Sequence, residues 1–542
     1  MADLTKSLKK YWVELCFVFL IPLVFYRAFM APYVTWDDDV LILKNPLLQL
    51  PFWEALKNAF QVYYHGDYFP LTLMSYWLDF QVFGLSAPAQ HIENLVLHLV
   101  ATLLLFRVLK SVSQKDRLSF FITLVFALHP LQMESVMWIS ERKSLLAAVF
   151  MFLSIAFYLK TVEKPGKASW YWLAVLFFAL MGLTKATALL LPALFLLLDW
   201  KYLAGARGKI FKRFLPLALL AGVLIVLRVQ AYSSSATEAG AVFRQSERLL
   251  QVPWMALTAI GFYIKMFFFP TPYSPIYPAY AVNSTTILWM VAAAGVLVFT
   301  AIYLWRKKNL FLWFCGAWFL LFLSPVLQLF PRINFVNDRY MYLPIVGLAG
   351  IFFYWVSEKV PAHLRTVKVF AGAAVTFAAS LGLQSFNRSE AFTSNRALWT
   401  QALTIVPEDM IALNNLGLDY HLAGEVDKAV ELYTKVVTQP GTNSLKAITF
   451  GNLAGIYSDH KYKGYDSEKA IQLYQKGIAS VQRLHETYEL RINLGITYKD
   501  LGRNAEAKEV LLAVLQDLSR ESDYKFQNLK IFVERHLQSL PN

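Results

Sequence analysis

The chain has 542 residues, of which 57% are hydrophobic, 16% aromatic and only 16% charged. Soluble proteins carry about 25% charged residues, so this composition excludes intrinsic disorder, a coiled coil and a single soluble domain. The formal net charge of +14 does not indicate nucleic-acid binding, because the Lys and Arg residues lie mostly between apolar segments, where they fix membrane topology.

Long apolar runs occupy residues 1–386. A membrane-spanning helix needs about 20 mostly apolar residues. The first run covers 12–31, an uncleaved signal anchor, and later runs begin near residues 90, 118, 144, 170, 186, 214, 252, 285, 310, 340 and 368. The sequence therefore predicts an all-α fold, a polytopic membrane bundle of about 11–12 apolar helices followed by a helical tail. The run 252–284 is interrupted by Pro270, Pro272, Pro275 and Pro278, and we interpret it as re-entrant or interfacial.

Basic loops predict how the bundle lies in the membrane. Lys and Arg are concentrated in the loops at 107–117, 201–213, 306–308 and 359–368. The positive-inside rule places these loops and the N-terminus in the cytoplasm. The opposite, periplasmic or luminal, side then receives the external loop 32–87, the outward segments around 129–143 and 329–339, and the tail. We expect a multi-pass membrane protein.

The tail contains an internal repeat. Asn-Leu-Gly at 415–417 recurs as Asn-Leu-Ala at 452–454 and as Asn-Leu-Gly at 493–495, each followed three residues later by Tyr. The second helices begin at Ala429, Ala470 and Ala507. This pattern resembles the tetratricopeptide repeat of about 34 residues, whose arrays bind peptides or proteins in a concave groove. We therefore predict two domains, a membrane domain over 1–389 and a tetratricopeptide domain over 390–542.

The first external segment carries the acids Asp37 and Asp38, with Asp39 next to them. Adjacent carboxylates repel one another unless a cation, a proton or a basic partner offsets their charge. A solvated acidic loop is the alternative interpretation. A divalent cation, Mg or Mn, could bind Asp37 and Asp38 through oxygen ligands, and the sequence leaves this metal open.

Other ionisable residues follow at the outward ends of apolar runs, where they are candidates for a functional site. They are His91, His129, Glu134, Arg142, Lys185, Asp338 and Arg339. Interfacial snorkelling is the alternative for Arg142, and structural hydrogen bonding is the alternative for His91, His129 and Glu134.

These groups together favour one kind of chemistry. Arg and Lys bind phosphate, a carboxylate can take the proton of a hydroxyl, and apolar helices can hold a lipid tail. A phosphate leaving group also needs positive charge nearby. This combination suits glycosyl transfer from a polyprenyl-phosphate sugar.

Several motifs, in this order along the chain, are shared with a known family. They are Asp37-Asp38 with Ile42, Asn45 and Pro46; Tyr68, Pro70, Leu71 and Ser75; His91, Asn94 and His98; His129-Pro130, Glu134 and Ser135; Glu141-Arg142-Lys143; Thr184-Lys185 with Asp199-Trp200; Arg248-Leu249, Pro270 and Tyr277-Pro278; and Asp338-Arg339-Tyr340 with Tyr342-Leu343-Pro344. With the repeats after the last span, the chain resembles the transmembrane-and-tetratricopeptide protein O-mannosyltransferases of the GT-C glycosyltransferase superfamily, in particular their bacterial relatives.

The resemblance implies an inverting enzyme whose donor is a polyprenyl-phosphate monosaccharide, such as mannose, and whose acceptor is a Ser or Thr hydroxyl of an exported protein. Asp37 would be the base, with Asp38 as the second acid. The donor phosphate would contact Arg142, Lys185 and Arg339, and substrate positioning would fall to His91, His129, Glu134 and Asp338. The resemblance to bacterial members also implies a bacterial inner membrane. Eukaryotic relatives commonly follow the residue matching Lys185 with Glu, whereas Ala186 stands here.

Two other functions stay open from the sequence. The same fold could glycosylate a lipid or a glycan, although a peptide groove favours a protein acceptor. The second possibility is a non-enzymatic assembly factor that recruits a partner through the repeats. A protein that only anchors such repeats in the membrane would need a single span, which disfavours this function. A transporter is disfavoured because the ionisable residues gather at one face and not at mid-membrane.

Overall fold

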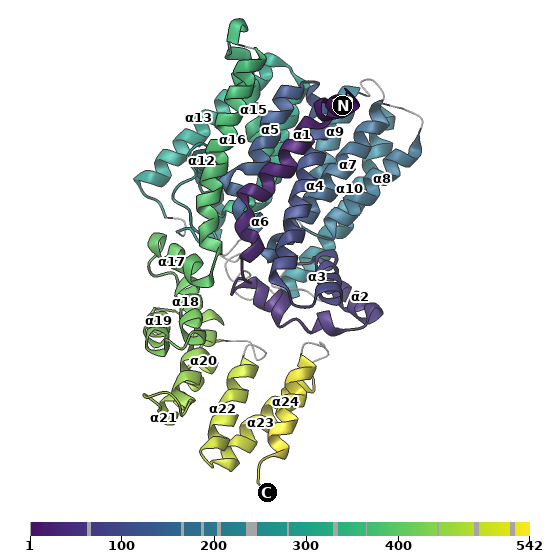
Figure 1. The fold of residues 1–542 in the computed structure, drawn as a ribbon. Coiled ribbons are helices and arrows are strands. Elements are labelled where there is room, and N and C mark those ends of the chain that lie inside the picture. Colours follow the sequence, from purple (N-terminus) through teal and green to yellow (C-terminus); the bar gives the residue numbers. More distant parts are fainter. Residues whose placement is uncertain are drawn as a thin grey trace. The chain divides into compact units, whose positions relative to one another are not determined.

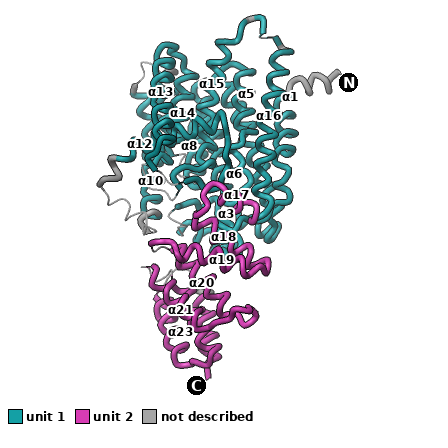
Figure 2. Tube along the Cα trace, turned by 90° about the vertical axis from the view of Figure 1, so that its left-hand side faces the viewer, with its two compact units in different colours: residues 1–394 teal, residues 395–542 magenta. Residues whose placement is uncertain are grey.

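A computed structural model describes residues 2–61, 67–163, 167–185, 189–202, 207–234, 246–278, 281–328, 334–364, 366–441, 444–481, 487–520 and 526–541. The chain divides into two compact units, residues 1–394 and residues 395–542 (Figure 2). The boundary predicted from the sequence lies between residues 389 and 390. Each unit is described separately below.

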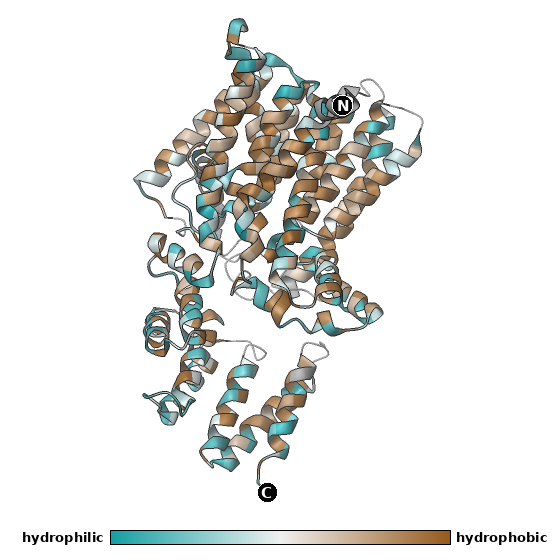
Figure 3. Cartoon of the chain, viewed as in Figure 1, coloured by the Kyte–Doolittle hydropathy of each residue, from teal (hydrophilic) through white to brown (hydrophobic). Residues whose placement is uncertain are grey.

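Unit 1 is built from long helices whose residues are mostly apolar (Figures 1 and 3). Each apolar run of the sequence contains one of these helices: α1 (Ala2–Val24), α4 (Ala87–Ser113), α5 (Asp116–Leu128), α7 (Arg142–Glu163), α8 (Ala168–Gly182), α9 (Leu191–Tyr202), α10 (Arg207–Ser234), α12 (Ser246–Phe268), α13 (Ser284–Lys307), α14 (Leu310–Leu323), α15 (Ile345–Lys359) and α16 (Val367–Arg388). The predicted all-α bundle is therefore confirmed.

Only some of these helices have the length and composition of a complete membrane span. Within the described residues, 5 helices are long and apolar enough, or up to 6 if α5 and the bent segment after it form one span. The 5 cover Ala87–Ser113, Ile139–Val162, Gly208–Ala231, Ser284–Lys307 and Lys368–Phe392. Helices such as α8 and α14, with 15 and 14 residues, fall short of the roughly 20 residues of a full span. The chain is nevertheless an integral membrane protein, as its long apolar helices indicate.

The proline-interrupted region consists of a helix and an irregular segment. α12 is continuous to Phe268 despite Pro253, and residues 269–278 then lack a helix. In that segment Tyr273, Ile276 and Tyr277 are buried. The interruption expected over all of 252–284 is thus confined to its second half, where protein covers much of the non-helical backbone.

The segments predicted to lie outside the membrane meet at one end of unit 1. The first apolar run ends in η1 (Tyr26–Met30), and the external loop forms η2 (Asp39–Leu43), η3 (Pro46–Gln49), α2 (Phe52–Gln61) and α3 (Pro70–Phe83). The later outward segments form η4 (Pro130–Gln132), α6 (Met133–Met137), η5 (Ile139–Glu141) and η8 (Asp338–Met341). α6 packs against α4, α7 and η8, and α3 and α6 lie toward the same end of the bundle in Figure 1. This end contains the candidate site.

Unit 2 is a series of helix pairs. After α17 (Asn395–Ile405), each predicted repeat forms one pair: α18 (Met410–Leu422) with α19 (Val426–Thr438), α20 (Ser444–Ser458) with α21 (Ser467–Ala479), and α22 (Tyr488–Asp500) with α23 (Asn504–Leu518). α24 (Gln527–Gln538) packs on α23. Small residues permit close pairing, because a Cβ added at Gly417 would lie 2.7 Å from the Tyr433 ring.

Candidate active site

The buried carboxylate of Glu141 lies within ion-pair distance of three cationic side chains. Glu141 ends η5 and its side chain is only 2% exposed. Lys185 Nζ lies 3.1 Å from its Oε2, while Lys143 Nζ and Arg339 Nε lie 3.6 and 3.5 Å from its Oε1. The Ser144 hydroxyl also donates to it. The three cation side chains retain 12–16% exposure. We call Glu141, Lys143, Lys185 and Arg339 the cation cluster.

Glu134 extends this cluster from α6. Its Oε1 accepts a hydrogen bond from Arg339 Nη1, whereas its buried Oε2 has no hydrogen-bond partner among the described residues. The Arg339 guanidinium also lies 5.8, 5.1 and 5.6 Å from the ring centroids of Trp36, Trp138 and Tyr340. Rings at this distance attract a cation through their π faces. Arg339 is therefore held in place from several sides.

Asp38 is a fully buried carboxylate with a structural set of partners. Its Oδ2 accepts from the backbone N–H of Val34 at 2.8 Å. Its Oδ1 accepts from the backbone N–H of Ser140 at 3.0 Å and from the Ser140 hydroxyl. Burial raises the pKa of Asp38 to about 7, although these hydrogen bonds oppose the rise. Asp38 thus fastens the external loop to the residue that precedes Glu141.

Asp37 has the opposite character. It is partly exposed, and its carboxylate makes no hydrogen bond or ion pair with any residue that the structure describes. Its charge nevertheless acts on the cation cluster. Burial lowers the pKa of Arg339, but nearby negative charges, that of Glu134 above all, outweigh this effect. The pKa of Arg339 is therefore raised overall, and Asp37 contributes to the rise. Asp37 therefore has a partly exposed carboxylate whose charge acts on two of the three cations, Lys143 and Arg339.

The structure does not bring Arg142 to the cation cluster that we expected it to join. Its side chain is 0% exposed and points toward α3 and α4. The guanidinium bonds Asp79, lies 3.0 Å from Glu93 Oε2, donates to Asn94 Oδ1 at 3.0 Å and donates to the Gln90 carbonyl at 3.2 Å. Because each of its nitrogens already has a protein partner, Arg142 ties α7 to α3 and α4.

The two candidate histidines also lie apart from the cluster. His129 Nε2 donates to the Phe267 carbonyl at 2.9 Å, and its Nδ1 accepts from the Leu131 N–H at 3.1 Å, which caps η4. His91 Nε2 lies 3.3 Å from the Pro32 carbonyl. Both are buried, so hydrogen bonding, the alternative that the sequence left open, describes them.

Asp338 pairs with Arg388 and not with Arg339, its neighbour in the sequence. It forms a buried ion pair with Arg388 at the end of α16 and accepts a hydrogen bond from the Tyr277 hydroxyl at 3.0 Å. Burial raises the pKa of Asp338, and the Arg388 charge opposes the rise. Of the candidates, then, Glu134, Lys185 and Arg339 come together with Asp37 nearby, whereas His91, His129, Arg142 and Asp338 serve other contacts.

Sequence reasoning missed Glu141 and Lys143 as site residues. The run Glu141-Arg142-Lys143 was visible, but its orientation depends on where α7 begins. Since α7 starts at Arg142, residues 141 and 143 turn toward Lys185 and residue 142 turns away. Ala186, the departure from the family pattern, lies outside the described residues.

The acidic pair does not fit a metal site. Asp38 is fully buried, and its oxygens accept hydrogen bonds from Val34 and Ser140, so Asp37 is the member of the pair with an accessible carboxylate, whereas Mg²⁺ and Mn²⁺ prefer several oxygen ligands. Throughout the described ranges, no group of three or more His, Cys, Asp or Glu is placed to hold a metal ion. No step of the chemistry below is routed through a metal.

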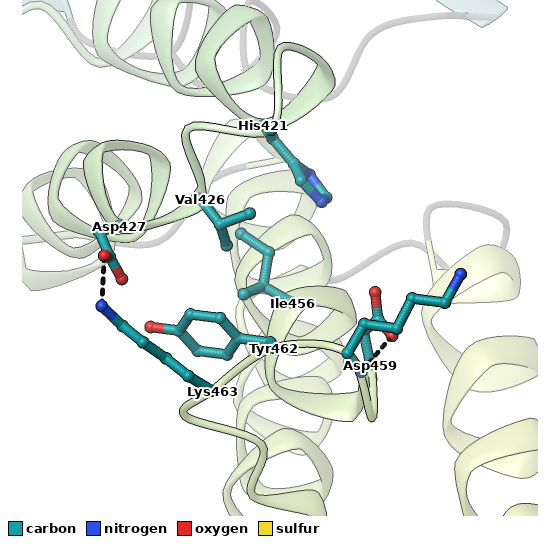
Figure 4. Close-up of a pocket in the computed structure, with 9 residues that line it drawn as sticks. His421, Val426, Asp427, Ile456, Asp459, Tyr462 and Lys463 are labelled. Atoms are coloured by element: carbon teal, nitrogen blue, oxygen red, sulfur yellow. Dashed lines mark hydrogen bonds and ion pairs between the residues drawn. The ribbon is translucent and has the colours of Figure 1, made fainter.

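Unit 2 contains a pocket of about 290 Å³ (Figure 4). It lies between the α18–α19 turn and the loop that follows α20, and His421 and Tyr462 help to line it. Lys463 and Asp427 pair across it at 2.6 Å. Because these charges are already paired, we assign no role to this pocket.

The comparisons with known proteins agree with the sequence motifs. No family model matches the chain. It is 24% identical over 400 residues to the protein O-mannosyl-transferase F38B6.6 of Caenorhabditis elegans, and this alignment covers 70% of this chain and 55% of that protein. It is also 24% identical over 507 residues to the human protein O-mannosyl-transferase TMTC4, with 79% and 66% covered.

Shorter and more distant similarities were also found. The Drosophila melanogaster protein O-mannosyl-transferase Tmtc2 is 31% identical over 189 residues, with 32% of this chain and 20% of that protein covered. The structure of ArnT from Cupriavidus metallidurans bound to undecaprenyl phosphate gives a TM-score of 0.40 at 14% identity, with 82% and 80% covered.

The homologues of this chain are therefore glycosyltransferases by name. More particularly, they are the TMTC protein O-mannosyl-transferases, the family whose motifs the sequence resembles. The chain spans only about half the length of the worm relative.

Proposed function

We propose that this chain transfers a monosaccharide, mannose or another hexose, from a polyprenyl-phosphate donor to Ser and Thr hydroxyls of exported proteins. One observation carries the proposal: Lys143, Lys185 and Arg339 converge on buried Glu141 at one end of an apolar helical bundle, with the accessible Asp37 beside them. The names of the relatives support the choice of mannose and of protein acceptors.

The cation cluster is the proposed binding site for the donor phosphate. Its three cations stay partly exposed, and Arg339 can form two parallel hydrogen bonds to phosphate oxygens. Burial lowers the pKa of Lys185, but the adjacent Glu141 carboxylate opposes this change and favours the charged ammonium. In this proposal Lys143 contacts the phosphate in place of Arg142, the residue expected from the sequence. The apolar helices around the site would hold the polyprenyl tail.

Asp37 is the proposed general base. It takes the proton of the acceptor hydroxyl while that oxygen forms a bond to C1 of the sugar. The bond between C1 and the phosphate oxygen breaks on the opposite face, and its electron pair stays on the polyprenyl phosphate. The cation cluster stabilises this negative charge as it develops. One such displacement inverts the configuration at C1. Asp38 acts as a positioning residue, because its own oxygens are occupied.

The proposed site opens on the periplasmic or luminal side, where exported acceptors are found. The helix pairs of unit 2 are the proposed receptor for acceptor segments, since arrays of this kind offer a concave surface to peptides.

The substitution Asp37→Asn tests the proposal. It should lower hexose transfer by roughly 10²–10⁴-fold, the usual contribution of a general base, while binding of polyprenyl phosphate is retained. The matched control is Asp39→Asn, because Asp39 only pairs loosely with the exposed Lys44 at 3.9 Å. The measurement is the mass of Ser- and Thr-containing peptides from exported proteins.

Full transfer in Asp37→Asn would remove Asp37 from the reaction. If exported proteins carry no hexose even with the unchanged chain, the acceptor is not protein, and the membrane lipids are the next sample.

A further inference from the structure

A second group of buried polar side chains lies next to the cation cluster. It consists of Glu134 from α6, Tyr273 and Tyr277 from the irregular segment after α12, Asp338 from η8 and Arg388 from the last turn of α16; we call it the Arg388 cluster. Of these residues, Glu134 also touches the cation cluster, because its Oε1 accepts a hydrogen bond from Arg339.

Arg388 is incompletely satisfied. Its side chain is only 4% exposed, and its Nη2 binds Asp338 and lies 3.5 Å from the Tyr277 hydroxyl. Its Nε and Nη1 are also buried, yet neither has a hydrogen-bond partner among the described residues. A buried donor without a partner bears the full cost of losing water. Two such nitrogens on one guanidinium therefore point to a bound group that accepts hydrogen bonds.

Glu134 contributes the opposite kind of atom, a buried hydrogen-bond acceptor. Its Oε2 is a buried acceptor without a partner among the described residues, while its Oε1 binds Arg339 of the cation cluster. Glu134 and Arg388 both act on Tyr273: burial chiefly raises the pKa of that phenol, Glu134 raises it further and Arg388 lowers it. The Arg388 guanidinium lies 4.1 Å from the Tyr273 ring centroid. Glu134 thus links the phosphate contacts to the Arg388 cluster.

We propose that the Arg388 cluster binds the hydroxyl groups of the donor sugar, an inference that rests on the proposed function. Arg388 Nε and Nη1 donate to hydroxyl oxygens, and Glu134 Oε2 accepts from a hydroxyl hydrogen. A hydroxyl both donates and accepts, so a polyol satisfies both kinds of unpaired atom, whereas an anion would be repelled by Glu134 and a lipid chain would satisfy neither. The sugar is also the part of the donor that is covalently attached to the phosphate.

The test compares two lipids on the purified full chain: polyprenyl phosphate and polyprenyl phosphate carrying a hexose. The unchanged protein should bind the sugar-bearing lipid about tenfold or more tightly, as expected for hydrogen bonds to charged groups. Arg388→Lys keeps a cation beside Asp338 but loses the two unpaired donors. It should bring the affinity ratio close to one and leave the affinity for the bare lipid unchanged.

Arg27→Lys is the matched control. Arg27 binds the Phe386 carbonyl and the Ser389 hydroxyl at the same end of α16 but does not belong to the Arg388 cluster. Its variant should keep the ratio of the unchanged protein.

Equal affinity of the unchanged protein for the two lipids would overturn the sugar site and leave the phosphate site standing. This comparison needs no variant and holds even if Arg388→Lys does not fold. An undiminished ratio in folded Arg388→Lys would also overturn the sugar site. Failure of the unchanged protein to bind either lipid would instead contradict the proposed function.

Discussion

Glu141 controls the charge of the site at the scale of single residues. Three cations in a partly buried space repel one another, and a carboxylate among them offsets that repulsion. Its oxygens are shared by Lys143, Lys185 and Arg339. The arrangement keeps the cations close together before any phosphate arrives, so little reorganisation accompanies binding of the donor.

Glu141→Gln should therefore destabilise the protein. The amide keeps the shape of the side chain but leaves three cations without their common carboxylate, and loss of one partner of a buried pair costs about 3 kcal/mol. Thermal unfolding in detergent measures the loss. Added phosphate, which can take the place of the carboxylate, should raise the unfolding temperature of the variant more than that of the unchanged protein. Equal stabilisation of both proteins would contradict this account, with chloride at the same ionic strength as the control.

Asp38 predicts a dependence of stability on pH. Its pKa is about 7 in the folded protein and about 3.9 in an unfolded chain. Between these values the folded state holds more protons, so the contribution of Asp38 to stability is greatest below pH 4 and is lost as the pH rises through 7. The difference is about 4 kcal/mol. Between pH 4.5 and 8, the unfolding temperature of Asp38→Asn should fall less steeply than that of the unchanged protein. Parallel curves of unfolding temperature against pH would refute Asp38 as the origin of the pH dependence.

Residue chemistry was partly predictable from the sequence. Glu134, Lys185 and Arg339 stood out because charged side chains beside apolar runs need partners, and they do meet. Which of Arg142 and Lys143 joins them depends on rotation of a helix by about 100° per residue. The sequence did not show where that helix begins, so it indicated Arg142.

At the scale of elements, close contacts between helix backbones depend on glycine. A Cβ on Gly261 of α12 would lie 2.3 Å from the Trp289 carbonyl oxygen of α13, and one on Gly347 of α15 would lie 2.3 Å from the Cys315 carbonyl oxygen of α14. Small residues allow helices in membranes to approach in this way.

Gly261→Ala should push α12 away from α13 and cost about 1–3 kcal/mol, as overpacking usually does. Gly295→Ala on α13 is the control, because nothing lies within 4 Å of its added Cβ. The control should be neutral or slightly stabilising, since Ala favours a helix by about 0.5–1 kcal/mol over Gly. Unfolding temperatures of the two variants decide the matter; equal values would argue against the close α12–α13 contact.

Elements were the most predictable level. Apolar runs marked the helices because burial in lipid requires a continuous apolar surface, and the repeated Asn-Leu-small tripeptides marked the helix pairs of unit 2. The region around 252–284 was predicted less well. Pro270, Pro272, Pro275 and Pro278 all follow the end of α12 at Phe268, whereas Pro253 lies inside that helix without ending it.

At the scale of the whole molecule, α4 separates the two ends of unit 1. Its 27 residues extend roughly 40 Å at 1.5 Å per residue, enough to cross a membrane. The external loop precedes α4, and the Lys110–Asp116 pair lies at its far end. The predicted sidedness therefore assigns these two places to opposite compartments.

Labelling of single cysteines tests this sidedness. In a chain whose Cys16 and Cys315 are replaced by Ala, an impermeant thiol reagent should label Glu54→Cys, on exposed α2, in intact cells. Asp116→Cys should react only after the membrane is permeabilised. Both positions are exposed, so accessibility within the fold does not distinguish them. The same labelling at both positions in intact cells would contradict the assignment.

The buried Arg142 also bears on how the chain is made. A buried charge that loses its partner is costly, by about 3–5 kcal/mol for a broken buried pair. Its partners Asp79 and Asn94 precede it by 63 and 48 residues, so they leave the ribosome before it does. When α7 enters the translocation channel, a carboxylate and an amide are already present to receive its charge. The order of synthesis thus delivers the acceptors first, and a permuted chain that began with α7 would have to insert an unpaired arginine.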